Sequence, residues 1–70
     1  SIMEQGTVKW FNADKGFGFI SREGEEKDLF FHMNELQDVQ FNELRVGDKL
    51  QFEVEESPKG LNAVRISRVA

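Results

Sequence analysis

The chain has 70 residues, contains no cysteine, and carries a formal net charge of -4 at pH 7. This length fits one small domain spanning residues 1–70 without room for a large substrate cavity, and the lack of cysteine excludes disulfides and thiolate metal sites. No apolar run approaches the ~20 residues that cross a bilayer and no secretory signal is evident, so a cytoplasmic protein without membrane partners is expected.

Basic residues are concentrated in two segments. Residues 7–22 hold three Lys or Arg against one Asp, and residues 57–70 hold three against no acidic residue. Residues 23–56 hold three against eleven Asp and Glu. The charges alone favour ordinary solvated side chains over a binding face, although a net-acidic protein can still present a basic surface.

Five segments are predicted to be strands, because β-branched and aromatic residues gather in short runs between turn-forming sequences. In chain order they are residues 7–12, 17–22, 28–33, 49–56 and 61–69. Residues 34–48 follow no clear period, with one helical turn expected near residues 34–37. Residues 1–5 are expected to be an N-terminal extension, and Ser1 and Ile2 are set aside because they precede Met3.

Five short strands favour a closed barrel, because closure leaves no exposed strand edge. The leading prediction is an all-β, five-stranded antiparallel OB-fold barrel, and an SH3-like barrel is the alternative. Segment 49–56 shows the pattern of a half-buried strand, since Leu50, Phe52 and Val54 share one face and polar residues share the other.

Segment 17–22 breaks this pattern. If Ile20 faces the core, Gly18 also faces inward, and Phe17 and Phe19 then face outward. Glycine on the inner face would let the strand coil tightly into a barrel.

Segment 28–33 leads to the same result. Burying Leu29 and Phe31 turns Phe30 and His32 outward, and the opposite choice would bury His32 and expose two larger apolar side chains.

Trp10 and Phe11 add two aromatic side chains in segment 7–12. In a regular strand adjacent residues point to opposite faces, whereas a β-bulge could bring both near one face.

Exposed aromatic side chains on neighbouring strands form an apolar patch, which on a small domain usually marks an interaction site. Lys9 precedes Trp10, and Lys15 stands two residues before Phe17. Ring faces can stack unpaired bases while lysines contact phosphates, so single-stranded nucleic acid is the favoured partner. Docking of a protein on the same patch is the alternative, and a third is that misassigned segments bury the rings.

Catalysis is not expected from this sequence. No nucleophile–base pair, phosphate-binding loop or metal-ligand spacing is evident, and His32 is the single histidine. We therefore expect no enzyme activity, no cofactor, no metal site and no small-molecule substrate.

The stretch "GTVKWFNADKGFGFI", followed by "DLFFH", resembles the cold-shock domain family of small bacterial cold-shock proteins and their Y-box relatives. The resemblance covers the chain from about Gly6 to Val69. It includes the family's K-G-F-G-F-I ribonucleoprotein motif and a second motif similar to V-F-V-H-F. It implies a five-stranded OB-type barrel that binds single-stranded RNA and DNA with little sequence selectivity, often preferring pyrimidine-rich stretches. An RNA chaperone that acts as a monomer is the expected protein.

Carried over position by position, the resemblance implies a binding face whose members are Lys9, Trp10, Lys15, Phe17, Phe19, Phe30 and His32. Phe11 is expected at its edge, partly buried. Asn12 and Asp28 match positions that hydrogen-bond bases. Phe41 matches a loop aromatic of the family, with ligand contact and coverage of a barrel end as its two alternatives.

Three departures from the family pattern bear on the site. Met33 replaces the usual Phe, so a flexible thioether is expected where relatives have a flat ring. It is included in the binding face, with packing as the alternative. Phe31 replaces the usual Val in the core. Leu61 replaces the usual Pro, and Lys59 is expected to supply the basic contact beside it.

Overall fold

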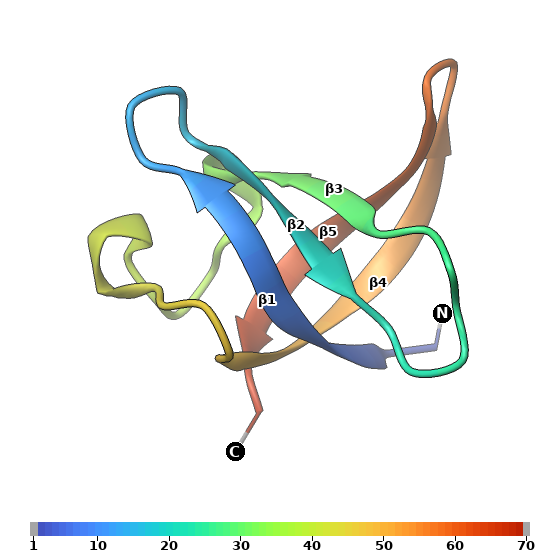
Figure 1. Ribbon diagram of the computed structural model, residues 1–70, viewed down its shortest axis with the longest axis horizontal. Coiled ribbons are helices and arrows are strands. Elements are labelled where there is room, and N and C mark those ends of the chain that lie inside the picture. Colours follow the sequence, from blue (N-terminus) through green and yellow to red (C-terminus); the bar gives the residue numbers. More distant parts are fainter. Residues whose placement is uncertain (1, 70) are drawn as a thin grey trace.

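Short turns and alternating apolar residues build a small closed barrel. The computed structural model describes residues 2–69, in which five strands form a closed barrel. Figure 1 shows how these strands curve around one another. The elements are β1 (Glu4–Asn12), β2 (Phe17–Ser21), β3 (Leu29–His32), the 3-10 helices η1 (Met33–Glu35) and η2 (Phe41–Glu43), β4 (Lys49–Ser57) and β5 (Gly60–Arg68). Within residues 2–69 no helix is long and apolar enough to cross a membrane.

The strands follow the order β1-β2-β3-β5-β4 around the barrel. Four neighbouring pairs are antiparallel, whereas β3 and β5 run parallel and share the single aligned pair Phe30 and Asn62. The all-β, five-stranded OB-type barrel is confirmed, but the expectation of a purely antiparallel sheet is wrong at this pair. An odd number of strands in a closed ring cannot alternate direction throughout, so one parallel pair is unavoidable.

The observed elements differ from the prediction mainly at the start of β1 and within residues 34–48. β1 begins at Glu4, three residues before the predicted start, because Glu4 to Thr7 pair with the first part of β4. The expected helical turn lies at Met33–Glu35, and the turn at Phe41–Glu43 was not predicted.

The inward-facing residues form one apolar core. Phe31 and Phe52 are its largest fully buried side chains. Ile20, Leu29 and Leu50 are buried beside them, as the alternation predicts. The aliphatic residues of the barrel therefore lie mainly inside, and few of them lie on the outer face of β1–β3.

Candidate nucleic-acid interface

Four aromatic side chains stand on the outer face of β1, β2 and β3. Strand pairing aligns Trp10 with Phe19 and Phe19 with Phe30. We call the rings of Trp10, Phe17, Phe19 and Phe30 the aromatic face. The outward positions of Phe17, Phe19 and Phe30 agree with the alternation, since Gly18, Leu29 and Phe31 are buried between them.

The rings of the aromatic face touch one another in a continuous row. Trp10 lies 5.8 Å from Phe17 and 5.9 Å from Phe19 between ring centroids. Phe30 stacks on Phe17 at 5.6 Å with an interplanar angle of 26°, and meets Phe19 edge-on at 5.9 Å. Contacts at these distances hold the rings in place before any ligand arrives.

A β-bulge in β1 turns Trp10 outward. The register between β1 and β2 shifts between Val8 and Trp10, so Lys9 is the extra residue. Val8 is buried, whereas Trp10, two residues later, is 49% exposed. Because the extra residue comes before Trp10, the bulge does not bring Trp10 and Phe11 to the same face. The side chain of Trp10 points outward, and that of Phe11 packs against the core.

Gly18 lets the aromatic face sit close to the core. A Cβ atom at this position would lie 2.7 Å from Cβ of Phe11 and 2.8 Å from both Phe31 Cε1 and the Trp10 carbonyl oxygen. These distances leave no space for a side chain, so only glycine allows β1, β2 and β3 to approach this closely.

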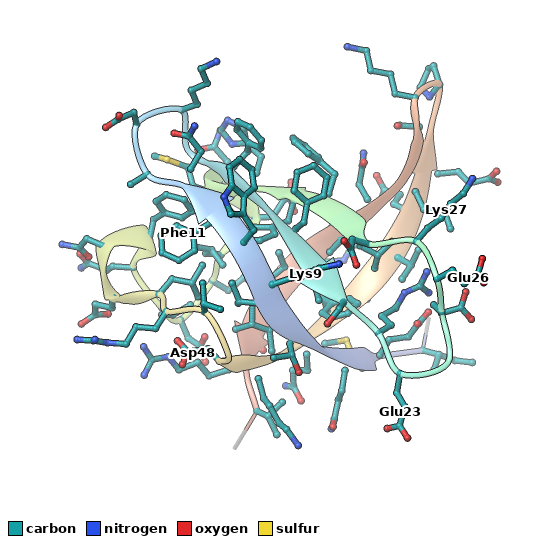
Figure 2. The ribbon with its side chains drawn as sticks, viewed as in Figure 1. Lys9, Phe11, Glu23, Glu26, Lys27 and Asp48 are labelled. Carbon is teal, nitrogen blue, oxygen red and sulfur yellow. The ribbon has the colours of Figure 1, made fainter. Side chains whose placement is uncertain are left out.

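Phe11 and Phe41 form a separate pair at the end of the barrel. Their rings meet edge-on at 5.5 Å, and both pack against the core while remaining half-buried. Figure 2 shows Phe11 on the side of β1 that faces the η2 segment. Phe41 thus covers a barrel end, and ligand contact by either ring stays a prediction.

His32 and Met33 continue the row from Phe17 toward the β1–β2 turn. His32 is exposed and pairs with Phe17 across the strands, and its Nδ1 accepts a hydrogen bond of 3.2 Å from the Asn34 backbone N–H. Met33 is 45% exposed, and its sulfur lies against Gly16, where an added Cβ would be only 2.6 Å away. Both side chains border the aromatic face without belonging to its ring contacts.

Asn12 stabilises the turn before Phe17. Its Oδ1 accepts a hydrogen bond of 3.0 Å from the Lys15 backbone N–H, and its carbonyl accepts one of 2.9 Å from Gly16 N–H. Gly16 has φ +73°, a conformation that glycine adopts without strain. The side chain of Asn12 therefore has a structural task that the sequence did not reveal.

Lys9 and Asp28 form an ion pair beside the aromatic face. The distance between Lys9 Nζ and Asp28 Oδ2 is 3.1 Å, and the lysine remains 61% exposed. Because the lysine is exposed and Asp28 is only partly buried, water screens the pair and its contribution to stability is small. Lys9 has the charge to contact a phosphate, and the carboxylate of Asp28 can accept a hydrogen bond from a base.

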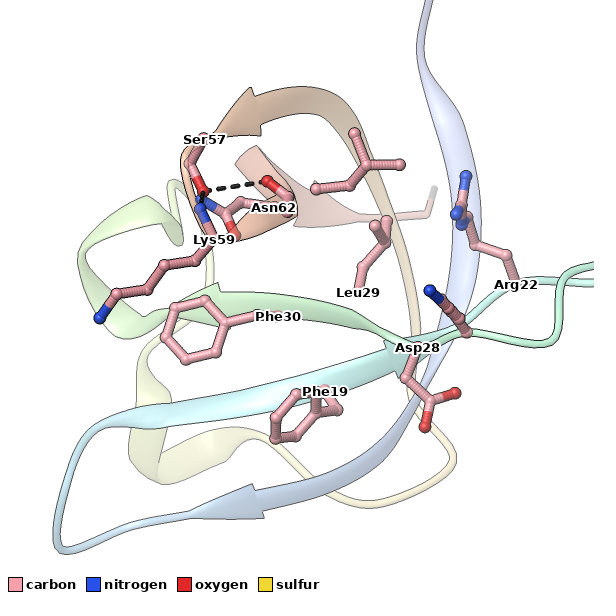
Figure 3. Close-up of a pocket in the computed structure, with 11 residues that line it drawn as sticks. Phe19, Arg22, Asp28, Leu29, Phe30, Ser57, Lys59 and Asn62 are labelled. Atoms are coloured by element: carbon pink, nitrogen blue, oxygen red, sulfur yellow. Dashed lines mark hydrogen bonds between the residues drawn. The ribbon is translucent and has the colours of Figure 1, made fainter.

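A groove of about 530 Å³ extends the aromatic face between β3 and the β4–β5 turn. Figure 3 shows Phe19, Phe30 and Asp28 on one side and Ser57, Lys59 and Asn62 on the other. Its remaining lining residues are Arg22, Lys27, Leu29, Gly60 and Leu61. Of the predicted site residues, the groove brings together Phe19, Asp28, Phe30 and Lys59.

Seven lining residues of this groove were not assigned to the site, namely Arg22, Lys27, Leu29, Ser57, Gly60, Leu61 and Asn62. The sequence had drawn attention to Leu61 only as a departure from the family pattern. The available signal was the turn sequence "SPKG" (57–60), which places residues 61 and 62 at the start of the last strand. Without the parallel pairing of β5 with β3, nothing indicated that this start lies beside Phe30.

The basic residues divide into paired and free groups. Arg65 contacts Glu53 at 2.9 Å and Glu55 at 3.5 Å, and the hydrogen bond that Arg65 donates to Glu53 is the main cause that raises the pKa of Arg65. Arg22 pairs with Glu4 at 3.1 Å and lies within 3.9 Å of Glu25. Neither arginine is a free cation, so the two basic segments offer fewer unpaired positive charges to a ligand than their composition suggests.

Four lysines remain for a ligand around this surface. Lys15, Lys27 and Lys59 form no ion pair with another described residue, and Lys9 has only its half-buried partner Asp28. Glu23 and Glu26 point outward from the β2–β3 loop (Figure 2). We refer below to Lys9, Lys15, Lys27 and Lys59 as the four lysines.

Known proteins resemble this chain over almost its full length. The model of the 'Cold-shock' DNA-binding domain matches residues 4–69. The major cold shock protein of Micrococcus luteus is 45% identical over 67 residues, which cover 96% of this chain and 100% of that protein. The major cold shock protein of Streptococcus pyogenes is 52% identical over 68 residues, covering 97% of this chain and 100% of that protein. A solved structure, drosophila Unr CSD456, is similar with a TM-score of 0.83 and 31% identity, covering 100% of this chain and 28% of that longer one.

Proposed function

This chain belongs to the cold-shock domain family, and on that premise we propose that it binds single-stranded RNA and DNA by stacking bases on the aromatic face. One observation carries the proposal. Four touching rings lie exposed or half-buried on one side of the barrel, and lysines surround them. Unpaired bases offer flat faces to such rings, whereas paired bases do not.

The energy of stacking gives an expected affinity. Each stacked base contributes roughly 1–3 kcal/mol. Four bases at about 2 kcal/mol each give about 8 kcal/mol, which corresponds to a dissociation constant on the order of 1 μM. Binding of this strength holds RNA unpaired yet releases it readily, as an RNA chaperone requires.

Low sequence selectivity follows from the same contacts. Every base has a π-face, so a row of rings accepts any sequence, and lysine contacts with phosphates carry no sequence information. Lys9, Asp28 and His32 add hydrogen-bonding groups at the border of the row. A modest preference for pyrimidine-rich strands, a monomeric state and a cytoplasmic location complete the proposal.

Fluorescence of Trp10 tests the proposal directly, because this is the single tryptophan and it belongs to the aromatic face. An oligothymidine should quench the fluorescence at low salt, with a dissociation constant near the micromolar range. A duplex of the same length should bind much more weakly. If no oligonucleotide binds at low salt, the stacking function is wrong, and the aromatic face becomes a candidate for protein docking.

A further inference from the structure

The second half of β4 has one edge that no other strand covers. β1 pairs with β4 only over Lys49–Phe52, and β3 lies beside β5 instead. Among the described residues, the stretch Glu53–Ser57 therefore pairs with β5 on one side and with no strand on the other. Figure 1 shows this half of the β4–β5 hairpin diverging from β1 toward its turn. We call the unpaired side of Glu53–Ser57 the β4 edge.

Backbone groups on the β4 edge are open to a further strand. Successive residues of a strand direct their N–H and C=O groups to alternate sides, so some of these groups point away from β5. Outside the strand ladders, no backbone–backbone hydrogen bond within residues 2–69 involves residues 53–57. An extended peptide that pairs with such an edge gains affinity from main-chain hydrogen bonds. The β4 edge is therefore a place where a strand can be added.

The side chains along the β4 edge determine which kind of strand fits. Val54 is half-buried, whereas Glu55 and Glu56 are exposed. Arg65 contacts Glu53 at 2.9 Å and Glu55 at 3.5 Å. Glu56 forms no ion pair with another residue of the described chain. Three carboxylates therefore share one guanidinium, and the edge keeps a negative charge.

This negative charge argues against two kinds of occupant. A nucleic acid would bring its phosphates beside the carboxylates and would be repelled. A second copy of the chain would place Glu55 and Glu56 near the same residues of the other copy, and like charges facing each other across strands are destabilising. Charged residues commonly protect a strand edge from such self-pairing. A positively charged segment meets neither obstacle.

We propose that the β4 edge docks an extended, basic segment of a partner protein, which adds a strand beside Glu53–Ser57. Main-chain hydrogen bonds hold the segment along the edge. Its lysine or arginine side chains pair with Glu55 and Glu56, and an apolar side chain packs beside Val54.

The position of the β4 edge makes it a site separate from the aromatic face. Glu4 is the first residue of β1 and pairs with Phe52, so Met3, which is 45% exposed, lies next to the start of the edge. Met3 offers apolar contact to the docked strand at that end. Trp10 lies toward the other end of β1. The inference is therefore independent of the proposed function, and one molecule could hold a nucleic acid and a basic protein segment together.

A short peptide, Thr-Lys-Lys-Val-Lys-Lys-Thr, tests the β4 edge at low salt, where exposed charges are least screened. Its sequence reads the same in both directions, so it suits a parallel or an antiparallel strand. In an NMR titration the peptide should shift the amide signals of residues 53–57, and hydrogen exchange of these amides should slow. The fluorescence of Trp10 should stay unchanged, because the rings lie elsewhere on the barrel.

Two backbone-modified versions of the peptide separate strand pairing from charge attraction. One carries N-methyl groups on its second, fourth and sixth residues, and the other on its third and fifth residues, and both keep every charge. A paired strand turns alternate N–H groups toward its neighbour. One version should therefore fail to bind, while the other should bind like the unmodified peptide.

Glu56→Gln tests the charge of the β4 edge, and Asp14→Asn is its matched control. Both carboxylates are exposed and form no ion pair within residues 2–69, but Asp14 lies in the turn between β1 and β2. Because one exposed ion pair is lost, Glu56→Gln should weaken peptide binding by up to about fivefold. Glu56→Lys should weaken it further, and Asp14→Asn should bind like the wild type.

Several results would overturn the docking site. They are an absence of amide shifts with the peptide, equal binding or equal failure of the two methylated peptides, and an equal loss in Asp14→Asn and Glu56→Gln. Protection of residues 53–57 by an oligothymidine, or by high protein concentration alone, would assign the edge to nucleic acid or to a second copy instead. A failure of oligothymidine to bind the aromatic face would refute the proposed function alone, so the two failures are distinguishable.

Discussion

Phe30 and Phe52 are the same residue type on opposite sides of the barrel wall, and replacing each with alanine separates binding from stability. Phe30 is half-buried in the aromatic face, whereas Phe52 is fully buried in the core. Phe30→Ala removes a stacking ring but leaves Trp10 with both of its ring neighbours, so the fluorescent reporter is preserved.

The structure gives a magnitude for each change. Loss of one stacked base should weaken binding by about 1–3 kcal/mol, or roughly fivefold to 150-fold. Phe30→Ala also loses two ring contacts, to Phe17 and Phe19, worth about 0.5–1.5 kcal/mol each, and opens no internal cavity. Phe52→Ala leaves a cavity in the core and should cost about 3–5 kcal/mol of unfolding free energy.

Two measurements on each variant decide the outcome. Titration with an oligothymidine, followed by Trp10 fluorescence, gives the affinity, and urea unfolding gives the stability. A domain of this length has a total stability of only about 3.5–10 kcal/mol, so Phe52→Ala could fail to fold. Phe52→Leu then supplies a milder core variant, which should lose stability and bind like the wild type.

The reasoning would be refuted if Phe30→Ala bound with wild-type affinity. It would equally be refuted if Phe30→Ala lost more stability than Phe52→Ala, since the inner and outer faces of the barrel would then be exchanged.

Three further predictions concern packing, charge and oxidation. Gly18→Ala should lower the unfolding free energy by about 1–3 kcal/mol, because its Cβ would meet Phe31 and backbone; a urea midpoint equal to wild type would contradict this. The four lysines should give a slope of log K against log salt of roughly -2 to -3 in titrations at several NaCl concentrations, and a slope near zero would exclude phosphate contacts. Mild peroxide should convert Met33 to the sulfoxide and weaken oligothymidine binding. The Met33→Leu variant should keep its affinity after peroxide treatment. The control Met3→Leu, which changes an equally exposed methionine, should lose affinity as the wild type does.

The alternation of side chains predicted the outer face of β2 and β3 correctly. Ile20 and Leu29 each fix the direction of their strand, and the neighbouring phenylalanines then have one possible direction. The same logic could not locate Trp10, because the extra residue of a bulge carries no distinctive sequence and reverses the alternation after it. Only the register against β2 shows which side Trp10 occupies.

Long-range contacts account for what the sequence did not reveal. The basic count of residues 57–70 suggested a charged face, but Arg65 is neutralised by Glu53 and Glu55 from the neighbouring strand. The groove brings residues near 30 beside residues near 60, and no local sequence pattern predicts this contact. The existence of one parallel pair was deducible, since a closed ring of five strands requires one, but which two strands form it was not.

The barrel closes along two junctions with different numbers of aligned residue pairs. β1 joins β4 through four aligned residues, from Glu4 to Thr7, whereas β3 joins β5 through the single pair Phe30 and Asn62. Local opening of the native state should therefore begin between β3 and β5, and amide hydrogens there should exchange earliest among the strands.

A nucleic acid bound across Phe30 and the start of β5 would bridge this weak junction. Ligand that binds only the closed barrel stabilises it by about 2.7 kcal/mol at a concentration one hundred times its dissociation constant. That amount is a large share of the stability of so small a domain. The resistance of this protein to unfolding and proteolysis in a cell should then track the supply of unpaired RNA.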